Sequence, residues 1–114
     1  MNIILCTDLI FSTKITGTAK ALNQPYAVAR TLDKLRELLD ATPAPHKIIL
    51  DLNITALDPL AAIQLAKSHP SAPHITAFLS HVQVELAAAA RTAGADRVLP
   101  LSTFTTELPQ ILSP

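Results

Sequence analysis

Five short apolar stretches, separated by segments with helical spacing, constrain the fold of this chain more than any other feature. The stretches cover residues 3–6, 25–29, 47–52, 75–79 and 97–99. They lack the alternation of apolar and polar residues that is typical of a strand with one exposed face. We therefore predict strands that are buried on both faces, as in a parallel sheet covered by helices on both sides.

The segments that follow each stretch carry apolar residues at the spacing of one helix face. They predict helices over residues 8–22, 31–42, 58–69, 82–93 and 105–112. Thr31 and Asp58 are typical N-caps, and Gly94 is the residue expected just after the fourth helix. A strand and a helix repeated five times predict a flavodoxin-like, doubly wound sandwich. Its five parallel strands are expected in the order 2-1-3-4-5.

The composition limits the classes of protein that remain. The 114 residues predict one domain over 1–114, and 49% hydrophobic with only 16% charged residues exclude a disordered chain. Nine basic and nine acidic residues give no net charge, so we expect no nucleic-acid partner. Two glycines are too few for a glycine-rich phosphate loop.

The length of the apolar runs and the single cysteine indicate where in the cell the protein is expected. No run reaches the roughly 18 residues of a membrane span, so we expect no membrane association. Cys6 has no second cysteine to pair with, which favours the cytoplasm. Because it lies within an apolar stretch, we expect its thiol to be buried and inert.

Polar residues follow three of the predicted strands where each strand ends. Asp8 follows the first strand, Asp51 and then Asn53 end the third, and Ser80 ends the fourth. In the order 2-1-3-4-5 the ligand site lies at this edge, so the side chains are expected to converge. Asp8 and Asp51 form a candidate Mg²⁺ site, and a carboxylate beside such a cation can accept a phosphoryl group. The alternative is structural: Asp8, Asp51 and Ser80 are also common helix or loop caps.

Two further segments complete the pattern. Residues 93–96 read Ala-Gly-Ala-Asp before the fifth strand, and residues 99–102 read Leu-Pro-Leu-Ser at its end. With the polar residues above, the chain resembles the receiver domain (CheY-like) of two-component response regulators over nearly its whole length. The resemblance makes Asp51 the phospho-acceptor candidate and Ser80 the candidate hydroxyl that follows the phosphoryl group. Asp8 matches the second acid of the receivers' acidic pair.

Two positions depart from the receiver pattern. Thr7 stands where receivers have the first acid, and Leu101 stands where they have a lysine. The first change removes a charge from the cation cage, and the second removes the cation that would pair with phosphoryl oxygens. The resemblance thus implies a degenerate receiver, or pseudo-receiver, in which Mg²⁺ binds weakly or not at all.

The leading hypothesis is a stand-alone, non-enzymatic signalling module that acts through protein–protein interaction. The resemblance implies a partner protein or self-association through the fourth helix, fifth strand and fifth helix, with a sensor histidine kinase as a second candidate partner. One alternative is a working phospho-accepting response regulator in a two-component phosphorelay. Another is a small-ligand-binding or enzymatic flavodoxin-like domain. His81 is the histidine nearest to the acidic site, whereas His69 and His74 are expected in a solvated loop at the opposite edge.

Overall fold

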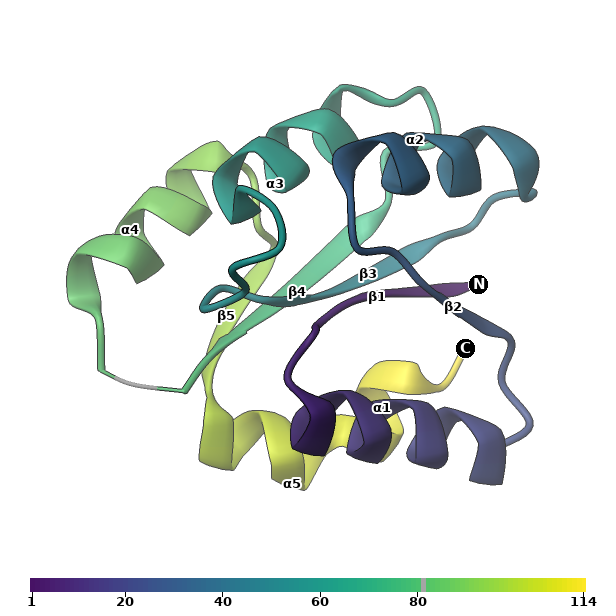
Figure 1. Cartoon of the computed structure of the whole chain (residues 1–114), viewed down its shortest axis with the longest axis horizontal. Coiled ribbons are helices and arrows are strands. Elements are labelled where there is room, and N and C mark those ends of the chain that lie inside the picture. Colours follow the sequence, from purple (N-terminus) through teal and green to yellow (C-terminus); the bar gives the residue numbers. More distant parts are fainter. Residues whose placement is uncertain (81) are drawn as a thin grey trace.

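A five-stranded parallel sheet lies at the centre of the molecule, with helices on both of its faces (Figure 1). The structure is a computed structural model and describes residues 1–80 and 82–114. Its elements are, in chain order, β1 (Asn2–Leu5), α1 (Leu9–Ala21), β2 (Tyr26–Val28), α2 (Leu32–Ala41), β3 (Lys47–Asp51), α3 (Pro59–Ser68), β4 (His74–Leu79), α4 (Val84–Ala93), β5 (Arg97–Pro100) and α5 (Leu101–Leu112).

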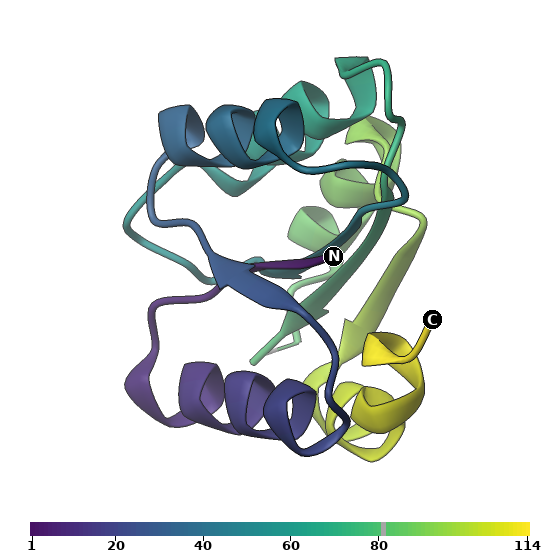
Figure 2. The ribbon, with the colours of Figure 1, turned by 90° about the vertical axis from the view of Figure 1, so that its right-hand side faces the viewer.

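The strand order is β2-β1-β3-β4-β5, so the predicted flavodoxin-like topology is confirmed. In the register, Ile4 is paired with Ile49, and Asp51 at the end of β3 is paired with Phe78 of β4. Helices α1 and α5 cover one face, and α2, α3 and α4 cover the other (Figure 2). The carboxyl ends of β1, β3, β4 and β5 therefore lie along one edge of the sheet.

The sheet separates two apolar cores, which explains why its strands show no alternation of apolar and polar residues. Ile3 and Leu5 pack into the core beneath α2, α3 and α4. Ile4, between them in sequence, packs into the core beneath α1 and α5. Successive side chains point to opposite faces of a strand, so both sets must be apolar when both faces are covered.

Local signals fix most helix ends where they were predicted. The Thr31 side chain accepts a hydrogen bond from Lys34 N, and the Asp58 carboxylate accepts from Leu60 N and Ala61 N. Gly94 follows α4 with a φ of 123°, the left-handed region that glycine adopts without strain.

Two predicted helix starts were wrong. Helix α4 begins at Val84 rather than residue 82, and α5 begins at Leu101 rather than residue 105. Pro100 is the N-cap of α5, and its φ of −65° suits a helix start. The helix also continues through Pro109, because the residues around it, Leu108 and Ile111, are anchored in the core.

The helices of the described residues were compared with the length and hydropathy of a membrane span. Within 1–80 and 82–114, none is both long enough and apolar enough to cross a bilayer.

Candidate functional site

The residues predicted to form a site line one cavity at the carboxyl edge of the sheet. Its volume is about 560 Å³. Its lining comes from the segments at the ends of β1, β3 and β4 and from the starts of α1 and α5, and consists of Thr7, Asp8, Phe11, Asp51, Asn53, Ile54, Thr55, Ser80 and Leu101. The predicted convergence of Asp8, Asp51 and Ser80 is thus present in the structure, and Leu101 lies beside them.

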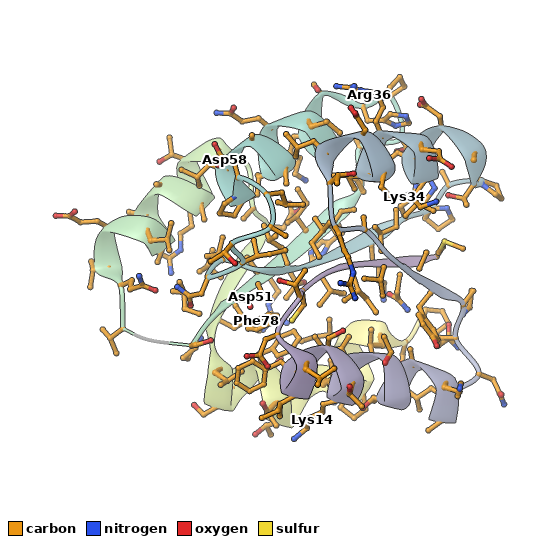
Figure 3. All side chains as sticks on the ribbon, in the orientation of Figure 1. Lys14, Lys34, Arg36, Asp51, Asp58 and Phe78 are labelled. Atoms are coloured by element: carbon orange, nitrogen blue, oxygen red, sulfur yellow. The ribbon has the colours of Figure 1, made fainter. Side chains whose placement is uncertain are left out.

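Asp51 is the acidic residue at the centre of this edge. It ends β3 and is only 4% exposed, between the two helix layers (Figure 3). Its Oδ1 accepts a hydrogen bond of 2.8 Å from Asn53 N, and its Oδ2 lies 3.9 Å from Cys6 Sγ. Burial raises the pKa of the Asp51 carboxyl, and the nearby charge of Asp8 adds to the increase, while the hydrogen bond from Asn53 opposes it.

Asp8 performs the capping role that the sequence left open as an alternative. The side chain is exposed, and its Oδ1 accepts a 3.0 Å hydrogen bond from Phe11 N in the first turn of α1. Ser80 does not cap the next helix, because Gln83 is the N-cap of α4. Ser80 is half-buried at the end of β4, where its side chain borders the cavity.

Asn53 connects this edge in a way that the sequence did not reveal. Its backbone N–H donates to Asp51, its Oδ1 accepts from Ser80 N at 2.9 Å, and its Nδ2 donates to Gln83 Oε1 at 2.5 Å. The side chain therefore links the ends of β3 and β4 to the start of α4. An asparagine two residues after a strand-ending aspartate is a signal for a turn, but it does not identify the distant partners.

The side chain of Leu101 is apolar, so this position supplies no cation to the cavity. No Lys or Arg is among the lining residues. The cation closest to it in sequence, Arg97, lies at the opposite end of β5 and pairs with Glu107 of α5 at 3.0 Å. The site therefore has two carboxylates and no basic side chain from the described residues.

Asp8 and Asp51 are the two carboxylates of this cavity that could ligate a divalent cation. Among residues 1–80 and 82–114, no group of three or more His, Cys, Asp or Glu side chains is arranged to hold a metal ion. Asp8 and Asp51 each already have one carboxylate oxygen occupied by a backbone N–H. Mg²⁺ takes six oxygen ligands at nearly ideal octahedral positions, so these two side chains leave most positions to water.

Cys6 is buried, as predicted. It is 1% exposed, and burial, with the charge of Asp51, raises the pKa of its thiol to about 12. The thiol is therefore protonated at neutral pH and is a poor nucleophile. His81, the histidine predicted nearest to the acidic site, lies outside the described residues.

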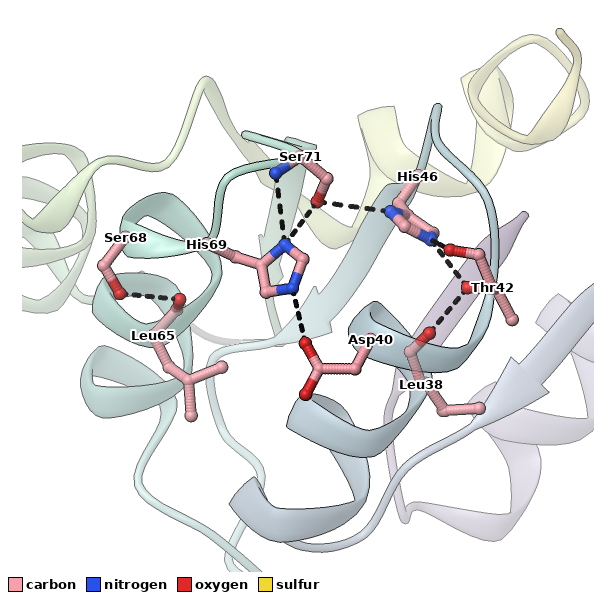
Figure 4. A network of polar contacts seen from close by, with 8 residues as sticks. All are labelled: Leu38, Asp40, Thr42, His46, Leu65, Ser68, His69 and Ser71. Carbon is pink, nitrogen blue, oxygen red and sulfur yellow. Dashed lines mark hydrogen bonds and ion pairs between the residues drawn. The ribbon is translucent and has the colours of Figure 1, made fainter.

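The other histidines lie at the opposite edge of the sheet, and two of them form a polar network (Figure 4). His74 is exposed, as predicted, but His69 is half-buried and its Nε2 lies 2.8 Å from Asp40 Oδ1. His46, which was not singled out from the sequence, is 3% exposed. Its Nε2 lies 2.9 Å from the Thr42 carbonyl oxygen, and burial lowers its pKa. The network joins α2 to the loop after α3, so its role is structural.

A second, more apolar cavity adjoins the first. It has a volume of about 420 Å³ between α4, β5 and the start of α5. Val84, Ala87, Val98 and Leu99 are among its lining residues, and Leu101 and Ser80 border both cavities. Val84 at its rim is 76% exposed.

Comparison with known proteins shows the fold. No family model matches the sequence, and no curated protein sequence matches it. Among solved structures, the receiver domain of NtrX from Brucella abortus superposes with a TM-score of 0.79 at 19% identity, covering 97% of this chain and 93% of that one. The chain therefore has the fold of response-regulator receiver domains.

Two other solved structures share this fold. One is a response regulator from Burkholderia pseudomallei with a phosphorylated aspartic acid, a calcium ion and citrate, at a TM-score of 0.77 and 18% identity. The match covers 98% of this chain and 65% of that regulator. The other is the beryllofluoride-activated NtrC4 receiver domain dimer, at a TM-score of 0.76 and 16% identity, covering 97% and 94% of the two chains.

Proposed function

We propose that this chain is a receiver-like signalling module that acts through protein–protein interaction and has an incomplete phospho-acceptor site. In this proposal Asp51 is the retained acceptor residue, Ser80 the retained hydroxyl, and Leu101 the position of the missing lysine. Mg²⁺ binds weakly or not at all through Asp8 and Asp51. The module is not an enzyme, and a cytoplasmic location stays a prediction from the sequence.

The observation that carries this proposal is the composition of the acidic cavity. The carboxylates of Asp8 and Asp51 line it together with Ser80, but no Lys or Arg is among the lining residues. A phosphoryl group on Asp51 would replace the single negative charge of the carboxylate by about two negative charges beside Asp8, and no basic side chain among the lining residues would compensate for the increase. We therefore propose that the chain keeps the receiver fold but does not act as a phosphorylation switch.

The experiment is an NMR titration with Mg²⁺ and then with beryllofluoride, a stable mimic of a phosphoryl group. Amide signals of the native chain are expected to show no saturable change. Saturable shifts centred on Asp51 and spreading to Ser80 and Val98 would overturn the proposal. The matched control is the double variant Thr7→Asp with Leu101→Lys, which supplies the missing acid and the missing base and is expected to restore binding.

A working phospho-acceptor in a two-component relay is the second candidate function. It is favoured by the position of Asp51 at the end of β3 within the cavity. A neighbour in fold, the Burkholderia pseudomallei regulator, carries a phosphorylated aspartic acid and a calcium ion. Incubation with acetyl phosphate tests this candidate by intact-protein mass spectrometry. A mass increase of one phosphoryl group that disappears in Asp51→Asn would support it, and no increase would exclude it for this donor.

The interaction surface in this proposal is the face made by α4, β5 and α5, where the second cavity lies. Its occupant is a partner protein, with a sensor histidine kinase as one candidate, or a second copy of the chain. Val84 is largely exposed there, and the NtrC4 receiver domain, similar in fold, forms a dimer. Sedimentation velocity tests the self-association. A dimer that Val84→Glu dissociates and Glu85→Gln preserves would support it, whereas a monomer at all concentrations leaves only a partner protein as occupant.

A further inference from the structure

The cavity at the carboxyl edge combines acidic groups with apolar walls. Asp8 and Asp51 supply its two carboxylates, and Phe11, Ile54 and Leu101 supply apolar surface. Since its lining residues include no Lys or Arg, the charged side chains that border it are both acidic. An incoming anion would meet like charges there, whereas an incoming cation would meet charges of opposite sign.

Asp51 itself has an oxygen that is short of donors. More than nine-tenths of the residue is buried, and within residues 1–80 and 82–114 the N–H that it accepts is that of Asn53, on Oδ1. The polar neighbour of Oδ2 is Cys6 Sγ at 3.9 Å, and a thiol is a weak donor. A buried carboxylate that lacks a cationic partner is costly, so a donor that carried positive charge into the cavity would relieve this cost.

The size and rim of the cavity indicate more than a bare ion. A volume of about 560 Å³ lies within the range of small-ligand sites, about 300–1,000 Å³. A metal ion would fill little of it and would leave the apolar walls in contact with water. Leu9 and Ile10, which follow Asp8 in sequence at the start of α1, are 80% and 77% exposed.

We propose that this cavity binds an organic cation, an ammonium or guanidinium group on an aliphatic stem. The cationic group lies against Asp51 and Asp8, and the stem covers Phe11, Ile54 and Leu101. The inference rests on the proposed function, in which the same cavity is incomplete as a phosphate and metal site. A free small amine and a Lys or Arg side chain of a partner protein offer the same chemistry.

An NMR titration with n-butylammonium chloride tests the proposal, with n-butanol as the uncharged ligand of similar shape. Saturable shifts of the amides of Asn53, Ser80 and Leu101 are expected with the amine, and at least tenfold weaker binding is expected with the alcohol. Nα-acetyl-lysine N-methylamide and Nα-acetyl-arginine N-methylamide, whose side chains keep their charge, distinguish the two sources. If either binds as tightly as the amine, the natural ligand is a side chain of a partner protein. If n-butylammonium binds and neither of them does, the natural ligand is a free small amine.

Three variants test whether the amine binds at Asp51 and Leu101. Asp51→Asn is expected to weaken amine binding about tenfold, the factor of one charge-assisted hydrogen bond. Leu101→Lys, which places an ammonium of the chain itself at the cavity, is expected to abolish it. Asp33→Asn is the control, because this carboxylate lies on α2 and its side chain is 95% exposed.

Three results would overturn the inference: no saturation by the amine, equal binding of butanol, or unchanged affinity in a folded Asp51→Asn variant. Each leaves the proposed function in place, because the magnesium and beryllofluoride titration tests that function with different ligands.

Discussion

Replacement of Asp51 by Asn is expected to make the protein more stable at neutral pH. Asparagine has nearly the shape of aspartate, and its Oδ1 can still accept the hydrogen bond from Asn53 N. The main change is the loss of a buried negative charge, together with its repulsion from Asp8.

The magnitude and its pH dependence follow from the raised pKa of Asp51. Because burial raises this pKa, the folded chain binds the proton more tightly than the unfolded chain does. The carboxyl group therefore favours folding below its ordinary pKa of about 3.9, and this contribution is lost as the pH rises through the folded-state pKa. At pH 7 we therefore expect Asp51→Asn to raise the free energy of unfolding and Tm; the loss of an imperfectly paired buried group is typically about 1 kcal/mol or more, which corresponds to about 4 °C in a domain of this size.

Urea denaturation at pH 4, 5, 6, 7 and 8 measures this difference. The gain of Asp51→Asn over the native chain is expected to shrink as the pH falls, because protonation of Asp51 neutralises the same charge that the substitution removes. Asp33→Asn, which changes an exposed carboxylate, is expected to alter stability by less than about 0.5 kcal/mol. A variant that is less stable than the native chain at pH 7, by a margin that grows with pH, would refute the reasoning. It would mean that a strong interaction holds the Asp51 carboxylate in its charged form.

Other predictions concern the glycines, the thiol and one ion pair. Gly94→Ala is expected to lose about 1–2 kcal/mol of stability by thermal unfolding, because its φ is 123° and a Cβ would lie 2.7 Å from Lys67 Cγ. Gly17→Ala, where a Cβ meets nothing within 4 Å, is the matched control and is expected to gain about 0.5–1 kcal/mol; a gain at both positions would contradict the argument. The Cys6 thiol, with a pKa of about 12, is expected to resist Ellman's reagent at pH 8 until the chain unfolds, and rapid reaction of the folded chain would contradict its burial. Asp96 accepts hydrogen bonds from Lys67 Nζ at 2.7 Å and from a backbone N–H, and these outweigh burial, which alone would raise its pKa, so that the pKa is lowered. Its contribution to stability is therefore present above the ordinary pKa and lost as the pH falls through the folded-state pKa. Asp96→Asn is expected to flatten this part of the acid-denaturation profile, and an unchanged profile would contradict the assignment.

The sheet could be predicted because its signals are local and repeated. The strands are short apolar runs, and the first four helices carry a cap or a stop of their own, such as Asp58 or Gly94. Topological rules then leave few arrangements of five such units. The start of α5 was missed because residues 99–102 were assigned to the end of the fifth strand and Pro109 argues against a long helix locally. The packing of Phe104 and Leu108, which outweighs that signal, depends on the whole fold.

The site could be predicted in position but not in its hydrogen bonds. Asp8, Asp51 and Ser80 follow strand ends, and parallel strands bring such residues together regardless of detail. The role of Asn53 depends on two partners 27 and 30 residues away, Ser80 and Gln83, which no local pattern encodes. The burial of His46 escaped prediction for the same reason, because Ser71, which shares its network, is 25 residues away.

Leu101 forms a common wall between the acidic cavity and the apolar cavity beneath α4. A change of its side chain therefore alters the shape of two sites at once, and the effects of any Leu101 variant on ligand binding and on partner binding are inseparable when it is studied alone. Ile54 borders only the acidic cavity, and Ala87 only the apolar one. A variant of Ile54 therefore changes only the acidic cavity, and a variant of Ala87 changes only the apolar one. A double-mutant cycle between these two residues measures how strongly the two cavities are coupled.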